Sequence, residues 1–192
     1  LAALEAGAQA VRPVVSINSV DGMVTAGERG GRKLPNADFS NSPTEILRQD
    51  LQEKELVLST TNGTECVRAA KQGDNPVLIA STVNASATAE KARLLHTETG
   101  RHITLLSAGR NNRLAEEDLA ACSLILERFG PATVRGIFDP TATDNLVSTF
   151  VNSDSGRNLI ELGAGADVIF CADVDTFDFA AEFDGERIHR LP

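Results

Sequence analysis

The stretch LVLSTTNGT, Leu56–Thr64, joins an apolar run to an abruptly polar turn. Its first three residues predict a strand buried on both faces, a pattern typical of parallel sheets. The next run, ECVRAAKQ (Glu65–Gln72), predicts a helix that ends before Gly73. Free amides at a helix N-terminus carry partial positive charge, and small or hydroxyl-bearing residues let a phosphate approach them. The stretch therefore indicates an anion cradle, although Ser, Thr and Asn also serve as plain helix caps.

Two further apolar runs end in polar turns ahead of a helical pattern. Val77–Ala80 (VLIA) precedes the turn STVNAS, and Ile103–Leu106 (ITLL) precedes SAGRNN. Short connections and right-handed crossovers favour parallel strands in such units, and ligands bind beyond the carboxyl ends of those strands. We therefore expect one polar crevice, lined by Thr60–Thr64, Asn84–Ser86 and Ser107–Asn112.

The rest of the chain supplies more elements of the same kind. Strands are expected at Ala10–Ser16, Met23–Ala26, Val168–Cys171 and Ile188–Leu191, and helices at Leu114–Phe129, Thr143–Val151 and Ser155–Leu162. A helix start is expected at Asn41–Glu45, with Ser42 as N-cap and Glu45 as its reciprocal capping-box partner. The pattern predicts an α/β fold in one domain over residues 1–192, with a layered, mostly parallel sheet, flanking helices and a ligand crevice at the carboxyl ends of the strands.

The opening residues, LAALEAGAQA, read as the tail of a helix that closes near Gly7. A domain of this class rarely starts inside a helix. We therefore expect that the 192 residues lack the N-terminal strand and the start of the first helix.

Composition narrows the classes of partner. The formal net charge is −9, and the chain has neither Trp nor Tyr. Nucleic acids and anionic membranes need a basic face, so both are disfavoured as partners. No apolar run approaches the roughly 20 residues that a membrane-spanning helix needs. The three cysteines, Cys66, Cys122 and Cys171, are scattered without a CxxC pair, which indicates reduced thiols and a cytoplasmic location.

Two charged segments have both a functional and a structural interpretation. Gly27–Lys33 (GERGGRK) can be a solvated turn, or an anion clamp in which glycine amides converge and Arg29 binds an acid in a bidentate way. The acids Glu116, Glu117 and Asp118 can pair with a helix dipole, or one or two of them can ligate a hard cation.

Six short motifs occur in order along the chain: GERGG (Gly27–Gly31), NSPTE (Asn41–Glu45), TTNGT (Thr60–Thr64), NAS (Asn84–Ser86), SAG (Ser107–Gly109) and AEED (Ala115–Asp118). Gly156-Arg157 and ADVIFCA, Ala166–Ala172, follow them. With these motifs the chain resembles the 2-phosphosulfolactate phosphatase family over essentially its whole length. It departs from the family pattern at Asn36–Ser40, where the family has Gly-Phe-Asp-x-Gly, and at Ser107 and Cys122, where the family has Cys and Gly. The initial Asp-x-x-Arg-Ala-[Ser/Thr] motif of the family does not occur in it.

The resemblance implies a magnesium-dependent acid phosphatase that hydrolyses the phosphate ester of a small 2-hydroxy acid, such as 2-phosphosulfolactate. In some microbes that step belongs to coenzyme M biosynthesis. The predicted catalytic residues are Glu28, Arg29 and Asn62, with Glu28 as a metal ligand or general base. The predicted phosphate- and substrate-binding residues are Gly30, Gly31, Asn41, Ser42, Thr60, Thr61, Gly63, Thr64, Asn84 and Ser86. Glu117 and Asp118 are the predicted Mg²⁺ ligands.

Two other hypotheses remain open at this point. The chain could be a non-catalytic anion-binding protein of the same family, or a structural α/β subunit without a ligand. The partners expected for the phosphatase are a small phosphorylated hydroxy acid and, in a homodimer, a second copy of the chain.

Overall fold

The computed structural model describes residues 1–17, 22–110, 113–136 and 143–192. Its strands are β1 (Ala10–Pro13), β2 (Val24–Arg29), β3 (Arg32–Lys33), β4 (Glu55–Ser59), β5 (Leu78–Ile79), β6 (Ala181–Phe183) and β7 (Ile188–Arg190). Its helices are α1 (Ala2–Glu5), α2 (Pro43–Ile46), α3 (Gly63–Ala70), the 3₁₀ turn η1 (Thr82–Asn84), α4 (Ala85–Thr99), α5 (Glu116–Phe129), α6 (Leu146–Asn152), α7 (Asp154–Glu161) and α8 (Gly165–Ala172). Within those residues, every helix is too short or too polar to span a bilayer.

The described strands form one mixed sheet in the order β3-β2-β4-β1-β7-β6-β5. β4 lies between β2 and β1 and runs parallel to both, while the other neighbouring pairs are antiparallel. The α/β class is confirmed, but the prediction of a mostly parallel sheet is wrong. Short hairpin turns join β2 to β3 and β6 to β7, and a hairpin always produces an antiparallel pair.

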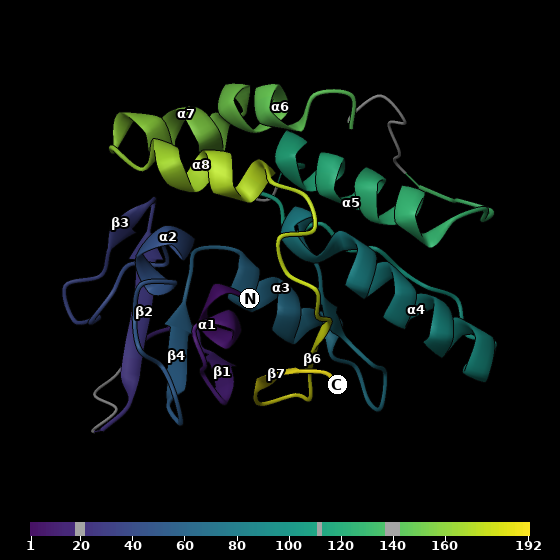
Figure 1. Ribbon diagram of the computed structural model, residues 1–192, viewed down its shortest axis with the longest axis horizontal. Coiled ribbons are helices and arrows are strands. Elements are labelled where there is room, and N and C mark those ends of the chain that lie inside the picture. Colours follow the sequence, from purple (N-terminus) through teal and green to yellow (C-terminus); the bar gives the residue numbers. More distant parts are fainter. Residues whose placement is uncertain (18–21, 111–112, 137–142) are drawn as a thin grey trace.

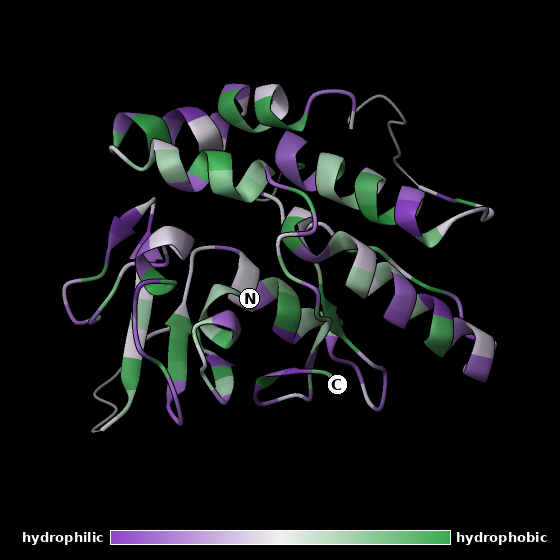
Figure 2. Ribbon diagram, viewed as in Figure 1, coloured by the Kyte–Doolittle hydropathy of each residue, from purple (hydrophilic) through white to green (hydrophobic). Residues whose placement is uncertain are grey.

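Burial along β4 explains why the sheet forms around it. Leu56 is 1% exposed and Val57 is 2% exposed, although they point to opposite faces. Both faces of the strand are therefore covered, as its continuous apolar run predicts. Leu56 joins Val11, Phe177, Phe179 and Phe183 in the main core. In Figure 2 the middle of β4 is hydrophobic, whereas the edge strand β3 is hydrophilic.

A helical layer lies beyond the carboxyl ends of β2 and β4. Figure 1 shows α5, α6, α7 and α8 gathered on that side, with α4 running along the flank of the molecule. α8 packs against α6, α7 and α2, and α4 packs against α5. The contact between α4 and α5 has its own small core, made of Ala85 and Ala89 from α4 with Leu124 and Ile125 from α5.

The expected strand at Val168–Cys171 is instead part of α8. Val168 and Ala172 are buried, whereas Ile169 between them is 46% exposed. Burial thus repeats every four residues, which is the period of a helix with one covered face. A short apolar run has no period of its own, so strand and helix could not be separated from the sequence.

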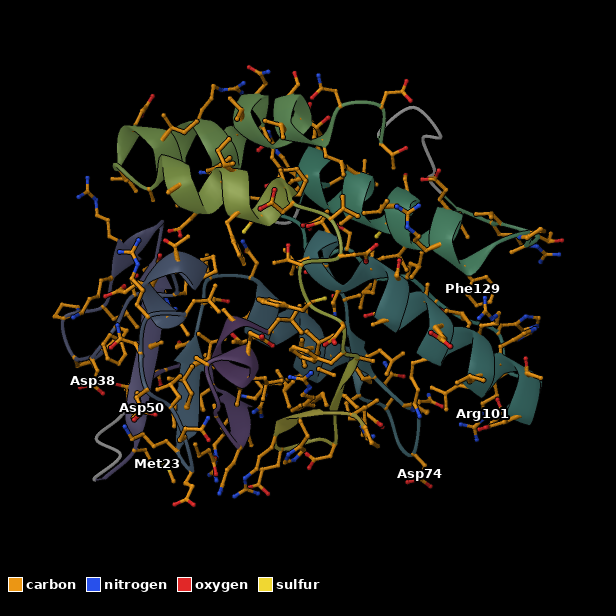
Figure 3. The ribbon with its side chains drawn as sticks, in the orientation of Figure 1. Met23, Asp38, Asp50, Asp74, Arg101 and Phe129 are labelled. Carbon is orange, nitrogen blue, oxygen red and sulfur yellow. The ribbon has the colours of Figure 1, made fainter. Side chains whose placement is uncertain are left out.

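The expected strand at Ile103–Leu106 is also wrong, because these residues lie outside the described ladders. Ile103 is 41% exposed and Leu106 is 57% exposed. The segment leaves the end of α4 after Gly100, and Figure 3 shows Arg101 at that end and Phe129 of α5 above it, on the same side of the molecule. His96 of α4 packs edge-on against Phe129 of α5 at this end.

Several local predictions are confirmed. α1 closes before Gly7, whose φ is +97°, and the break between α6 and α7 falls at Ser153, whose hydroxyl accepts the Gly156 amide at 3.0 Å. Ser42 caps α2 by accepting the Glu45 amide at 3.1 Å. The reciprocal half of that capping box is wrong, because the Glu45 carboxylate accepts the Ser40 amide instead.

Candidate active site

Gly27–Lys33 forms the end of a hairpin and not a loop. Arg29 pairs with Arg32 across a two-residue turn, in which Gly30 has φ +60° and Gly31 has φ +83°. Two successive positive φ angles define the tight turn that suits a right-twisted hairpin, and glycine adopts them without strain. A Cβ on Gly31 would also lie 2.9 Å from Leu162 Cδ1 at the end of α7. The hairpin tip therefore packs against the helical layer, beyond the carboxyl end of β4.

The Glu28 carboxylate ties this hairpin to the turn after β4. Its Oε1 accepts the Thr61 amide at 2.7 Å and the Thr61 hydroxyl at 3.0 Å, and its Oε2 accepts the Gly31 amide at 2.8 Å. Glu28 is only 7% exposed. The predicted residues Glu28, Gly31 and Thr61 are thus brought together, with Gly30 donating to the Thr61 hydroxyl at 3.4 Å.

Arg29 points to the last residue of β4. Its guanidinium donates to the Ser59 hydroxyl at 3.0 Å, to the Glu28 carbonyl at 2.7 Å and to the Val15 carbonyl. Ser59 is fully buried and donates to the same Val15 carbonyl at 2.9 Å. Among the described side chains, no carboxylate lies within ion-pair distance of Arg29. A cation is therefore held at this edge without a counter-ion from that part of the chain.

α3 begins at Gly63, four residues after the Ser59 to which Arg29 donates. Asn62 is the N-cap residue, yet its side chain makes no capping hydrogen bond. The first amide of α3 that donates a helical hydrogen bond is that of Cys66, which donates to the Asn62 carbonyl at 3.1 Å. The amides of Gly63, Thr64 and Glu65 precede it and have no acceptor among the described groups. Such amides attract anions.

The remaining residues of the turn have more local roles. Thr64 is 3% exposed, and its hydroxyl points back to the Thr60 carbonyl at 3.4 Å. A Cβ on Gly63 would lie 3.5 Å from the Thr60 hydroxyl, which is an ordinary van der Waals contact. Thr60 itself is half-buried.

Asn41 and Ser42 lie at the start of α2 and make no hydrogen bond to this turn among the described residues. Asn41 is exposed. Ser42 donates to Asp167 Oδ1 at 2.8 Å, and Thr44 donates to the same oxygen through its hydroxyl at 2.6 Å and its amide at 3.2 Å. Asp167 is buried in α8. Sequence reasoning missed this carboxylate because it assigned the neighbouring residues to a strand, although ADVIFCA was among the motifs recognised.

The structure does not bring Asn84 and Ser86 to the turn after β4, because β1, β7 and β6 separate β5 from β4. Asn84 is fully buried and donates to the carbonyls of Ile79 at 3.1 Å and Phe179 at 3.3 Å. Ser86 donates its amide and hydroxyl to Asp175, at 2.7 Å and 2.6 Å. The expected single crevice is therefore wrong for these two residues.

The motifs SAG and AEED meet at the start of α5. Asp118 Oδ2 accepts the Ser107 hydroxyl at 3.0 Å and the Gly109 amide at 2.6 Å. The Ser107 carbonyl lies 4.0 Å from Cys66 Sγ in α3, so this segment lies between α5 and α3. Residues 111 and 112, also expected in the crevice, lie outside the described residues.

The carboxylates at the start of α5 are the candidate ligands for Mg²⁺. In the part of the chain that the structure describes, no three His, Cys, Asp or Glu side chains converge as a metal-binding group. Mg²⁺ is commonly held by one or two carboxylates, with water and substrate phosphate oxygens completing its shell. Asp118, held in place by two donors, and the half-buried Glu117 fit that requirement.

The thiols are poor candidates for nucleophiles. Burial raises the pKa of Cys66 and of Cys122, and the nearby Asp118 carboxylate raises both further. Burial also raises the pKa of Cys171 to about 11. A thiol with a raised pKa stays protonated at neutral pH, so it is a weak nucleophile.

A surface hollow lies elsewhere, along the second half of α5. It is lined by Ser123, Leu126, Glu127, Gly130, Pro131, Ala132, Val134 and Thr143. Its lining is largely apolar and contains none of the predicted site residues. The polar groups at the ends of β2 and β4 therefore remain the better candidate for an anion site.

Known proteins match the chain over nearly its full length. The 2-phosphosulpholactate phosphatase family profile matches residues 1–186. The probable 2-phosphosulfolactate phosphatase of Thermus thermophilus is 35% identical over 190 residues, covering 89% of this chain and 76% of that protein. The protein of the same name from Carboxydothermus hydrogenoformans is 30% identical over 194 residues, covering 94% of this chain and 79% of its own. The chain therefore belongs to the 2-phosphosulpholactate phosphatase family.

Proposed function

We propose that this protein hydrolyses the phosphate ester of a small 2-hydroxy acid, with 2-phosphosulfolactate as its substrate. Water supplies the oxygen that replaces the ester oxygen on phosphorus, and the products are inorganic phosphate and the free hydroxy acid. Membership of the family supports the reaction class. The names of the relatives from Thermus thermophilus and Carboxydothermus hydrogenoformans support the choice of substrate.

One observation carries the location of the reaction. The N-terminus of α3 has no side-chain cap, and Arg29 donates to Ser59, four residues before that helix begins. A phosphate ester brings up to two negative charges, which both groups favour. The overall charge of −9 would repel such a substrate elsewhere on the surface.

The proposed roles follow from these positions. Amides at the start of α3 and the Asn62 side chain donate to the phosphoryl oxygens, while Arg29 offsets the charge that develops on them in the transition state. Thr60 and Gly63 shape the turn, and the Gly30–Gly31 tip closes it from the side of β2. Asp118 and Glu117 would hold Mg²⁺, which would supply a further positive charge for the phosphoryl oxygens.

The test is release of inorganic phosphate from 2-phosphosulfolactate by the purified protein, with Mg²⁺ and with a chelator. We expect turnover that falls at least tenfold when the metal is removed. Phosphoserine and phenyl phosphate, which carry the same ester on other alcohols, serve as specificity controls. Absence of turnover on every ester would contradict the proposal.

A second candidate is non-catalytic binding of phosphorylated acids. It is supported by the engagement of Glu28 and Asp118 with protein donors, which leaves fewer carboxylate oxygens for chemistry. Calorimetry that finds tight binding of 2-phosphosulfolactate without phosphate release would favour it. The place in coenzyme M biosynthesis, the cytoplasmic location, the homodimer and the exclusion of nucleic acid stay predictions.

A further inference from the structure

We infer that Glu28 is a positioning residue, which holds the hairpin tip and the turn after β4 in one arrangement, and that it is neither a metal ligand nor a general base. The inference rests on the proposed function for its kinetic readouts. Its structural basis is the set of contacts that the carboxylate makes with Gly31 and Thr61.

Both oxygens of Glu28 are occupied by protein donors. Oε1 takes the Thr61 amide at 2.7 Å, and Oε2 takes the Gly31 amide at 2.8 Å. The Thr61 hydroxyl lies 3.0 Å from Oε1 and 3.2 Å from Oε2, so it can donate to either oxygen. A carboxylate that acts on metal or water needs an oxygen directed toward the substrate, whereas these are directed into the loop.

Burial adds a second argument. Glu28 is 7% exposed, and a buried carboxylate is costly unless several donors surround it. Gly31 and Thr61 belong to segments 30 residues apart in sequence, and both donate their amides to this one carboxylate. By accepting both amides, Glu28 fixes the distance between the hairpin tip and the start of α3.

The arrangement also decides which amides remain for a ligand. The Thr61 amide points to Glu28, so it is not available to a phosphate. The amides of Gly63, Thr64 and Glu65 come next and start at a position that Thr61 anchors. Displacement of Thr61 would therefore move the whole set of donors relative to Arg29.

The Glu28→Gln variant tests the inference, because glutamine keeps the size of the side chain. Its NH₂ group would face the Gly31 or the Thr61 amide, placing one donor against another. We expect the KM for 2-phosphosulfolactate and the inhibition constant of inorganic phosphate to rise at least tenfold. The fall in kcat should be smaller than the rise in KM, and the acid side of the pH–rate profile and the Mg²⁺ concentration for half-maximal activity should stay unchanged.

Glu55→Gln is the matched control, because Glu55 is a bonded carboxylate at the opposite end of β4. It should lower stability and leave KM unchanged. A higher Mg²⁺ requirement in Glu28→Gln, with activity restored by excess metal, would overturn the inference in favour of a metal ligand. Loss of kcat at unchanged KM, with loss of the acid limb, would overturn it in favour of a general base.

Hydrogen exchange of the Gly31 and Thr61 amides keeps the inference separate from the proposed function. Both amides should be protected in the wild type and exchange at least tenfold faster in Glu28→Gln, while the Leu56 and Val57 amides stay protected. This readout needs no catalysis. If no ester is hydrolysed, the proposed function fails, but amide exchange still tests whether Glu28 holds the hairpin tip and the turn after β4 together. Equal exchange in both proteins would overturn it.

Discussion

The turn after β4 and the turn after β5 have similar sequences and opposite structural roles. Both follow an apolar strand, carry Asn with Ser or Thr, and lead into a helix. In the second turn, Asn84 is fully buried with both amide hydrogens donated to carbonyls. In the first, Asn62 is half-buried and makes no capping hydrogen bond. A polar turn thus has a structural role where its hydrogen-bond donors are paired within the protein, and it can bind a ligand where its donors remain unpaired.

The helix termini differ in the same way. At α4, the Ser86 amide donates to Asp175, so a carboxylate from the chain already sits at that N-terminus. Arg128 lies 3.6 Å from Asp175 and offsets its charge. At α3, no carboxylate among the described residues accepts the first free amides, although Glu65 belongs to the first turn. The cation Arg29 donates to Ser59, four residues before the helix begins. The first terminus carries its own anion, and the second is suited to an external one.

We expect the largest effect from a substitution in the buried turn after β5. Asn84→Asp would leave the Ile79 and Phe179 carbonyls without donors and would place a carboxylate in a fully buried site. We expect a loss of about 3–5 kcal/mol in the free energy of unfolding. Urea denaturation followed by circular dichroism measures it. A loss below about 1 kcal/mol, the usual value of one hydrogen bond, would show that the two hydrogen bonds of Asn84 do not stabilise its turn.

The same substitution at the other turn should act on activity instead. Asn62→Asp would place a negative charge where we expect the phosphate. We expect turnover to fall about 100-fold, equivalent to about 2.7 kcal/mol, with stability within about 1 kcal/mol because Asp and Asn are similar N-caps. Steady-state kinetics and denaturation on the same sample check both parts. Full activity, or unfolding, would mean that the turn is only a connection.

The next comparison is between Arg29, beside the turn after β4, and Arg128, which pairs with Asp175. Arg29→Lys keeps the charge and loses the planar fork that reaches Ser59 and two carbonyls, so activity should fall about tenfold. Arg128→Lys, beside Asp175, should leave kcat/KM unchanged. Phosphate-release assays on both variants measure the difference. Equal losses would argue against a special role for Arg29.

The smallest effect concerns pH. Burial would raise the pKa of Asp175, but the hydrogen bonds from Ser86 and the charge of Arg128 outweigh it, so the pKa is lowered. A carboxyl with a depressed folded pKa stabilises the protein above its unfolded pKa, about 3.9. That stabilisation is lost as the pH falls through the folded value.

Asp175→Asn should therefore cost about 1 kcal/mol or less at pH 7 and nothing below the folded pKa of Asp175. Urea denaturation between pH 7 and pH 2.5 compares the variant with the wild type. A difference that stays constant over that range would mean that the ionised form of Asp175 contributes no stability.

Local sequence was sufficient for much of the fold and part of the site. The apolar run in β4, the N-cap at Ser42 and the helix break at Ser153 were all predicted, because each depends on neighbours within a few residues. The glycine pair at 30–31 was predicted as a solvated turn or an anion clamp, and its positive φ angles instead form a tight hairpin. The family resemblance, and not the strand pattern, grouped Glu28 and Arg29 with the Thr60–Thr64 turn, and the structure joins Glu28 to Thr61.

Tertiary structure decided what depends on distant partners. The apolar run at 168–171 became a helix because a covered face lay on one side only, and the run at 103–106 found no strand to pair with. The order of strands placed Asn84 four positions along the sheet from the turn it was expected to join. Sequence by itself thus determined which turns could bind an anion, through residue type and local geometry. Only the packing of distant elements decided which turn kept its donors, because a hydrogen bond to Phe179 or Asp175 spans about ninety residues of chain.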